Sequence, residues 1–139
     1  MFSSSCPLLS LSGQRPTSLG LKKNQLTPCP NTPNCVCSQD PDPGHQIDPL
    51  TFEGAPKDAF TKLKTILADT GNAEIIQETR NYIYAEFTSG LLGFVDDVEF
   101  YLDSREKVIQ VRSASRLGKS DLGANKSRVK SIQKKLKKA

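Results

Sequence analysis

The side chains best suited to chemistry gather on two strands predicted near the end of the chain. Phe94–Asp103 and Val108–Ser115 alternate apolar and polar residues, and the four residues between them suit a hairpin loop. Pairing across that loop places Glu99 opposite Arg112, which is a favourable cross-strand pair. A slip of one residue would turn the apolar side chains into water, so the register is well determined.

Three polar residues depart from this alternation. Asp96, Ser113 and Ser115 fall on the apolar face, where a buried polar group without a hydrogen bond costs about 1–3 kcal/mol. Arg116, Arg128 or backbone N–H groups of the following loop could bond them. We therefore expect the open end of the hairpin to meet the start of the last helix.

That last helix, predicted over residues 126–138, begins with basic side chains. Asn125 suits the N-cap position, and Lys126 and Arg128 follow in a first turn whose helix dipole prefers acids. Such an end attracts an anion. The anion could be a carboxylate of the same chain, such as Asp121, or a bound phosphate or carboxylate.

These observations define a candidate site for an anionic ligand, in which arginine side chains would hold the anion. An internal ion network is the alternative, because structural networks perturb charges as readily as functional sites do. The candidate site consists of Asp96, Asp97, Glu99, Arg112, Ser113, Ser115, Arg116, Asp121, Asn125 and Arg128.

A second group of reactive residues lies in Pro28–Ser38, which holds three cysteines and three prolines. The C-x₅-C-x-C spacing fits a zinc site poorly, so no metal is predicted. A Cys29–Cys35 disulfide is sterically conceivable and requires an oxidising compartment. Alternatively, Cys35 or Cys37 could be a reactive thiol with His45 as its base, or the thiols could be buried groups that hold an irregular segment against the domain.

Periodicity predicts the elements that position these groups. Short links between them favour an antiparallel meander. The predicted fold is therefore α+β, a four-stranded antiparallel meander sheet with two helices packed on one face. Helices are predicted over residues 56–70 and 126–138, and strands over 73–79, 82–89, 94–103 and 108–115.

Proline separates an N-terminal part from this body. All nine prolines lie at or before Pro56, so an extended Pro/Cys-rich leader is expected there rather than helix or central strand. Residues 1–27 are Ser-rich and free of acids, and we predict a disordered or loosely ordered leader over them. Residues 28–139 are predicted to form a single domain.

Charge is also unevenly distributed. All 15 acidic residues lie between Asp40 and Asp121, whereas residues 122–139 carry seven basic residues and no acid. The basic segment could contact acidic proteins or lipids, but it has no aromatic residue for stacking, which disfavours specific nucleic-acid binding. No apolar run approaches the roughly 18 residues of a membrane span. We expect a cytoplasmic protein, with a plastid or thylakoid location as the alternative because the N-terminus weakly resembles a transit peptide.

Four motifs, in the same order, resemble domain-of-unknown-function family 1499, which has members in bacteria, including photosynthetic ones, and in plants. The resemblance covers the chain from about Gln14 onward, and it implies no established activity, catalytic residue or cofactor. The motifs are Cys29-Pro-Asn-Thr-Pro-Asn-Cys35 with Ser38-Gln39, Gly93-Phe-Val-Asp-Asp-Val-Glu-Phe100, Val111-Arg-Ser-Ala-Ser-Arg116, and Ser120-Asp-Leu-Gly-Ala-Asn125 with Arg128-Val129.

The sequence thus predicts a small domain that binds an anionic small molecule or partner at the candidate site. The first alternative is a small hydrolase or thiol-dependent enzyme, with Asp96 or Asp97 as general base or Cys35 as nucleophile. The second is a scaffold or interaction protein that uses its basic C-terminal helix. The sequence does not decide whether the protein is an enzyme, and it predicts no cofactor and no oligomeric state.

Overall fold

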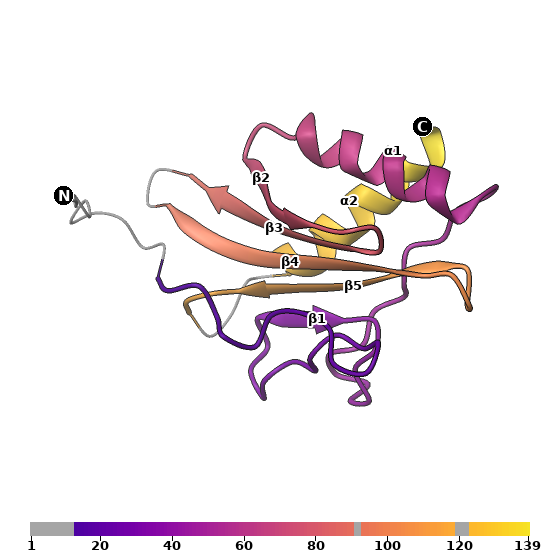
Figure 1. Ribbon diagram of the computed structural model, residues 1–139. Helices are drawn as coiled ribbons and strands as arrows, with labels where there is room; N and C mark the ends of the chain where they lie inside the picture. Colours follow the sequence, from indigo (N-terminus) through magenta and orange to yellow (C-terminus); the bar gives the residue numbers. More distant parts are fainter. Residues whose placement is uncertain (1–12, 91–92, 119–122) are drawn as a thin grey trace.

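The computed structural model describes residues 13–90, 93–118 and 123–139 (Figure 1). The strands β3, β4 and β5 have the bounds predicted from the sequence, and α1 and β2 end within two residues of theirs. The elements are β1 (Cys35–Cys37), α1 (Pro56–Ala68), β2 (Ala73–Glu78), β3 (Tyr82–Ser89), β4 (Phe94–Asp103), β5 (Val108–Ser115) and α2 (Ala124–Lys138).

The strands form one antiparallel sheet in the order β1-β5-β4-β3-β2. The fold is α+β as predicted, but the sheet has five strands and not four. The additional strand, β1, lies in the Pro/Cys-rich segment and pairs Cys35 with Ala114 and Cys37 with Arg112. A segment of three residues is too short to show the alternation typical of a strand, so the sequence pattern could not predict β1. It is a strand because it pairs with β5.

The hairpin of β4 and β5 has the predicted register. Glu99 lies opposite Arg112, and Asp103 lies opposite Val108 at the loop. Val98 and Phe100 therefore share one face of the sheet, and Asp97 and Glu99 share the other.

The face that carries Val98 and Phe100 forms the main core. Both helices contribute to the same cluster of buried residues, α1 through Leu63 and Leu67 and α2 through Ile132 and other side chains of one apolar stripe. Figure 1 shows α1 and α2 on one side of the sheet. Full burial of each such side chain contributes about 1.5–3 kcal/mol, so this face holds the helices in place.

The N-terminal segment packs against the opposite face of the sheet, so this face is buried as well. Leu26 is 2 % exposed and packs with Cys37, Tyr82, Tyr84 and Tyr101. In Figure 1 the indigo and purple part of the chain lies on the side of the sheet away from the helices. Residues 1–12 lie outside the described residues, and the division into a leader over 1–27 and a domain over 28–139 stays a prediction.

The start of α2 differs from the prediction. The N-cap is Gly123, whose φ of 82° is the left-handed conformation that glycine adopts readily, and Asn125 lies inside the first turn. Asn125 is completely buried, and its side chain forms hydrogen bonds with Ser113, Ser115 and the Asn34 carbonyl oxygen. Within the described residues, neither helix is long and apolar enough to cross a membrane.

Candidate functional site

The predicted site residues lie on both faces of the sheet and form two separate networks. Asp96 faces α2, and its neighbour Asp97 faces the N-terminal segment, because successive side chains of β4 alternate. The network on the face of Asp96 also contains Ser113, Ser115, Asn125 and Arg128. The face of Asp97 also carries Glu99, Arg112 and Arg116. Asp121 lies outside the described residues. The single patch expected from the sequence is therefore divided by the sheet itself.

Arg128 is the centre of the network on the helix face. Its Nη2 donates to Asp96 Oδ2 at 2.6 Å, and its Nη1 donates to Ser113 Oγ at 3.1 Å and to Asn125 Oδ1 at 2.8 Å. The guanidinium carbon also lies 4.8 Å from the centre of the Phe87 ring, which is a cation–π contact. Arg128 thus ties α2 to the sheet and satisfies the buried acid that the sequence singled out.

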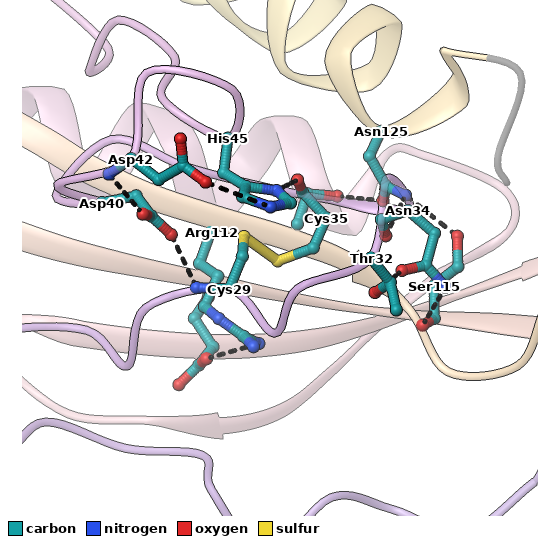
Figure 2. The surroundings of a disulfide bond; sticks show 12 residues. Cys29, Thr32, Asn34, Cys35, Asp40, Asp42, His45, Arg112, Ser115 and Asn125 are labelled. Carbon is teal, nitrogen blue, oxygen red and sulfur yellow. Dashed lines mark hydrogen bonds and ion pairs between the residues drawn. A yellow bond between two sulfur atoms is a disulfide. The ribbon is translucent and has the colours of Figure 1, made fainter. Parts of the chain in front are cut away.

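Asn125 extends this network to β1. Ser113 Oγ donates to Asn125 Oδ1 at 2.7 Å, and Asn125 Nδ2 donates to Ser115 Oγ at 2.9 Å and to the Asn34 carbonyl oxygen at 3.2 Å. Figure 2 shows Asn125 beside Asn34 and Ser115. One side chain therefore links α2, β5 and the residue that precedes β1.

Arg116 is the centre of a network on the other face. Its Nη2 and Nε donate to the two Asp97 carboxylate oxygens at 2.6 and 3.1 Å, and its Nη2 donates to Glu86 Oε2 at 2.9 Å. Tyr84 donates its hydroxyl to Asp97 Oδ1, and Arg15 Nε donates to Glu86 Oε2 at 2.7 Å. Sequence reasoning missed Tyr84, Glu86 and Arg15, although the alternation of β3 places Tyr84 and Glu86 on one face.

The pKa values of Glu86 and Arg116 in this network favour their charged forms. Burial alone would raise the pKa of the Glu86 carboxyl, but hydrogen bonds from Arg15, Tyr84 and Arg116 outweigh burial and lower that pKa to about 2. The hydrogen bond to Asp97 is the main cause of a raised pKa for Arg116. Both groups are therefore charged at neutral pH, and each carboxylate already has a guanidinium partner.

Glu99 and Arg112 form a less complete pair under the N-terminal segment. Glu99 Oε2 accepts hydrogen bonds from the Tyr82 hydroxyl at 2.5 Å and from the Gly20 N–H at 2.8 Å, whereas its Oε1 lies 3.8 Å from Arg112 Nη1. Glu99 Oε1 and Arg112 Nε are buried and have no hydrogen-bond partner among the described residues. Burial raises the pKa of the Glu99 carboxyl. The hydrogen bond from the Gly20 N–H to Glu99 ties the N-terminal segment to the sheet. The burial of two charged groups with incomplete hydrogen bonding opposes this stabilisation.

The cysteine segment contains a Cys29–Cys35 disulfide (Figure 2). Asp40 accepts a hydrogen bond from the Cys29 N–H at 2.7 Å, and His45 Nδ1 lies 3.1 Å from the Cys35 carbonyl oxygen. Cys37 is a free thiol with no exposed surface, and burial raises its pKa. The oxidised form therefore presents no accessible thiolate from Cys35 or Cys37. Among the described residues, no group of three potential ligands could hold a metal ion.

The open surfaces lie away from both networks. A groove of about 750 Å³ runs between residues 46–51 and α2, where Lys126, Lys130 and Lys137 line it together with Val129. Gln133 exchanges two hydrogen bonds with the backbone of residue 51, at 2.7 and 3.0 Å, and thereby fixes the two walls of the groove against each other. The sequence analysis identified the basic helix, but it did not identify residues 46–51 as the other wall of the groove.

Comparison with known proteins supports the family resemblance. No curated protein matches the chain significantly. A family model described as "Protein of unknown function (DUF1499)" matches residues 25–136, which begin before β1 and end within α2. The match includes the whole sheet, α1 and both networks except Arg15 and Gly20. The chain therefore belongs to the DUF1499 family of proteins of unknown function.

Proposed function

We propose that this protein is a binding domain for an acidic polypeptide segment, which lies in the groove between residues 46–51 and α2. The observation that carries the proposal is the row of lysines along one wall. Lys126, Lys130 and Lys137 line an open groove, and none of them forms an ion pair with another described residue.

The charge of the groove is suited to an anionic partner. The helix α2 has no acidic residue, and one acid, Asp48, lines the groove against the three lysines. Cations that face the same space without counter-charges repel each other, and a bound anion removes that repulsion.

The shape of the groove favours a chain with some apolar side chains. Ile47 and Pro49 line the groove and are half-buried, so they contribute apolar surface to the wall that faces the lysines of α2. The hydrogen bonds between Gln133 and residue 51 fix the two walls relative to each other, and such preorganisation lowers the entropic cost of binding.

A polypeptide fits this surface better than a membrane or a nucleic acid. The apolar stripe of α2, which includes Val129, Ile132 and Leu136, is buried in the core, so α2 has no apolar face to insert into lipid. The helix also has no aromatic side chain on which bases could stack.

The Asp/Ser/Arg residues have a supporting role in this proposal. Arg128 and Arg116 hold Asp96 and Asp97, so an anion at the site predicted from the sequence would have to displace a carboxylate. A ligand-binding role for those residues stays a prediction, and no observation favours the hydrolase or thiol-enzyme alternative. The contacts of Arg128 with Asp96 and Ser113 hold α2 in the position that forms the groove.

The test uses a fluorescent oligoglutamate peptide as probe, with an oligoglutamine peptide of equal length as the uncharged control. Fluorescence anisotropy would be measured with wild-type protein, with K126Q/K130Q/K137Q, and with K134Q/K135Q/K138Q. The second triple variant removes the same charge from exposed α2 residues that do not line the groove. We expect the groove variant to weaken binding about tenfold and the matched control by less than about threefold.

Raised salt should weaken the wild-type complex further, because the contacts are between exposed charges. Equal losses in the two triple variants would mean diffuse attraction by the basic helix, and the groove proposal would then be rejected. No binding of oligoglutamate by the wild-type protein, even at low ionic strength, would also reject it.

A further inference from the structure

A second hollow lies at the end of the sheet where the chain turns between strands. It has a volume of about 790 Å³, and it shares no lining residue with the α2 groove. Its walls come from residues 23–25 and Gln39 of the N-terminal part, Lys57 of α1, the β2–β3 turn and the β4–β5 loop. Segments far apart in the sequence thus meet around one space.

Each of four of these segments places a cation at the hollow. The cations are Lys23, Lys57, Arg80 and Arg105, and none of them forms an ion pair with another described residue. All four side chains are exposed, and all four line the same concavity. Their mutual repulsion is relieved when an anion lies between them.

The acids at the hollow do not neutralise these cations. Asp103 accepts hydrogen bonds from the Glu106 N–H and from Gln110 Nε2, both at 3.2 Å, and it is thereby held within its own hairpin. Glu106 lines the hollow but forms no ion pair with a described cation. The lining has four cations against these two acids, so its charge remains positive.

The walls of the hollow are fixed by backbone hydrogen bonds. Lys22 and Gln25 exchange two of them, at 2.9 and 3.1 Å, around a turn in which Lys23 and Asn24 have φ values of 54° and 61°. The Leu102 N–H donates to the Asn81 carbonyl oxygen at 2.8 Å on the opposite wall. Lys23 and Arg80 therefore project from turns whose backbone is hydrogen-bonded, and Lys57 projects from α1. Groups held in this way bind a small ligand with little loss of entropy.

We infer that this hollow binds a small molecule with two or more phosphate or carboxylate groups. Its volume lies in the range of small-molecule sites, roughly 300–1,000 Å³, and it exceeds what one phosphate would fill. Arg80 and Arg105 offer planar guanidinium groups that bind either kind of anion through paired hydrogen bonds. The inference stands apart from the proposed α2 groove, since the two surfaces have no residue in common.

The experiment titrates the intact protein with pyrophosphate and with citrate at low ionic strength, by calorimetry and by amide shifts in NMR spectra. Binding should weaken about tenfold or more in R80Q/R105Q. The control K134Q/K135Q removes the same charge from exposed α2 residues away from the hollow, and it should change binding less than about twofold. K126Q/K130Q/K137Q should also bind normally, which separates this site from the α2 groove.

Amide shifts confined to residues 23–25, 80–81 and 103–106 would place the ligand in the hollow. Binding of pyrophosphate but not citrate would identify a phosphate ligand, the reverse would identify a carboxylate ligand, and either supports the inference. Failure of both anions to bind, or equal weakening by R80Q/R105Q and K134Q/K135Q, would overturn it.

Discussion

Asp96 and Asp97 are neighbours in the chain, yet they belong to two ion pairs on opposite faces of the sheet. Asp96 holds Arg128 of α2, and Asp97 holds Arg116 at the end of β5. Each buried carboxylate therefore has a guanidinium partner close by, which offsets the cost of its removal from water. At the scale of single residues, these two ion pairs hold elements of the protein together.

Sequence reasoning identified part of this arrangement for a clear reason. Asp96, Ser113 and Ser115 interrupt an apolar face, so each needs a hydrogen-bond partner, and Arg128 was among the partners named. No such signal identified Glu86, because it falls on the polar face of an alternating strand. In the sequence it therefore looks the same as a solvent-exposed glutamate. Its role depends on Arg15, which is 71 positions away in the chain.

Glu86 leads to a prediction about pH. Its pKa is about 2 in the folded protein against 4.5 for the unperturbed carboxyl, so its stabilising contribution is present above pH 4.5 and is lost as the pH falls toward 2. Glu86→Gln should therefore be less stable than wild type at neutral pH, and the difference should shrink over that acid range. Urea denaturation at a series of pH values would measure it.

The control for this prediction is Glu53→Gln, which changes the same functional group at an exposed position outside the sheet. Its difference from wild type should be small at every pH. A difference between Glu86→Gln and wild type that stays constant down to pH 2 would contradict the assigned ion pair.

At the scale of elements, β1 shows how a short segment becomes a strand. It has three residues, and it is held by pairing with β5, by the Cys29–Cys35 disulfide and by the link from Asn34 to Asn125. The neighbouring prolines prevent a longer strand. An edge strand of this kind depends on its anchors more than on its own sequence preference.

The disulfide provides a test at this scale. It joins residues six positions apart. A closed loop of that length reduces the conformational entropy of the unfolded chain, which stabilises the folded state by about 2–3 kcal/mol. Reduction of the wild-type protein, or the variant C29S/C35S, should lower the free energy of unfolding by that amount. Chemical denaturation with and without a reducing agent would show it.

The variant C29S/C35S also serves as the internal control, because its stability should not respond to the reducing agent. Equal stability of oxidised and reduced wild-type protein would mean that the disulfide does not anchor β1. The reductant should have its effect through Cys29 and Cys35, since Cys37 has no disulfide partner.

At the scale of the whole molecule, the sheet has two buried faces with different chemistry. The helices cover an apolar face, whereas the N-terminal segment covers a face that combines tyrosines with ion pairs. The N-terminal segment is joined to that second face by apolar packing of Leu26 and by hydrogen bonds through Gly20 and Arg15.

Leu26 gives a direct test of this second buried face. Leu26→Ala should lower the free energy of unfolding by about 2–5 kcal/mol, as truncation of a buried leucine does. Leu117→Ala makes the same substitution at a side chain that is 41 % exposed, and it should cost less than about 0.5 kcal/mol. Thermal and urea denaturation would compare the two variants.

Similar stability of Leu26→Ala and Leu117→Ala would show that residues near Leu26 do not pack on the sheet in solution. Limited proteolysis adds a second measurement. Cleavage within residues 13–27 should be slow in wild type and should accelerate in Leu26→Ala, because local opening controls access to the backbone.

The sequence by itself determined most elements of this protein and the register of the β4–β5 hairpin. Helix and strand periods are local properties of the chain, so α1, β3, β4 and β5 could be placed from pattern alone, and the apolar face followed from alternation. The motifs of the resemblance also pointed to the family that the comparison confirmed.

Only the tertiary structure decided which side chains meet. The chain order of Asp96 and Asp97 says nothing about the helix and the N-terminal segment that cover the two faces, and β1 exists only through its partner strand. The two open hollows are likewise built from segments distant in sequence. Contacts between distant segments depend on how the whole chain packs, and local periodicity carries no information about that packing.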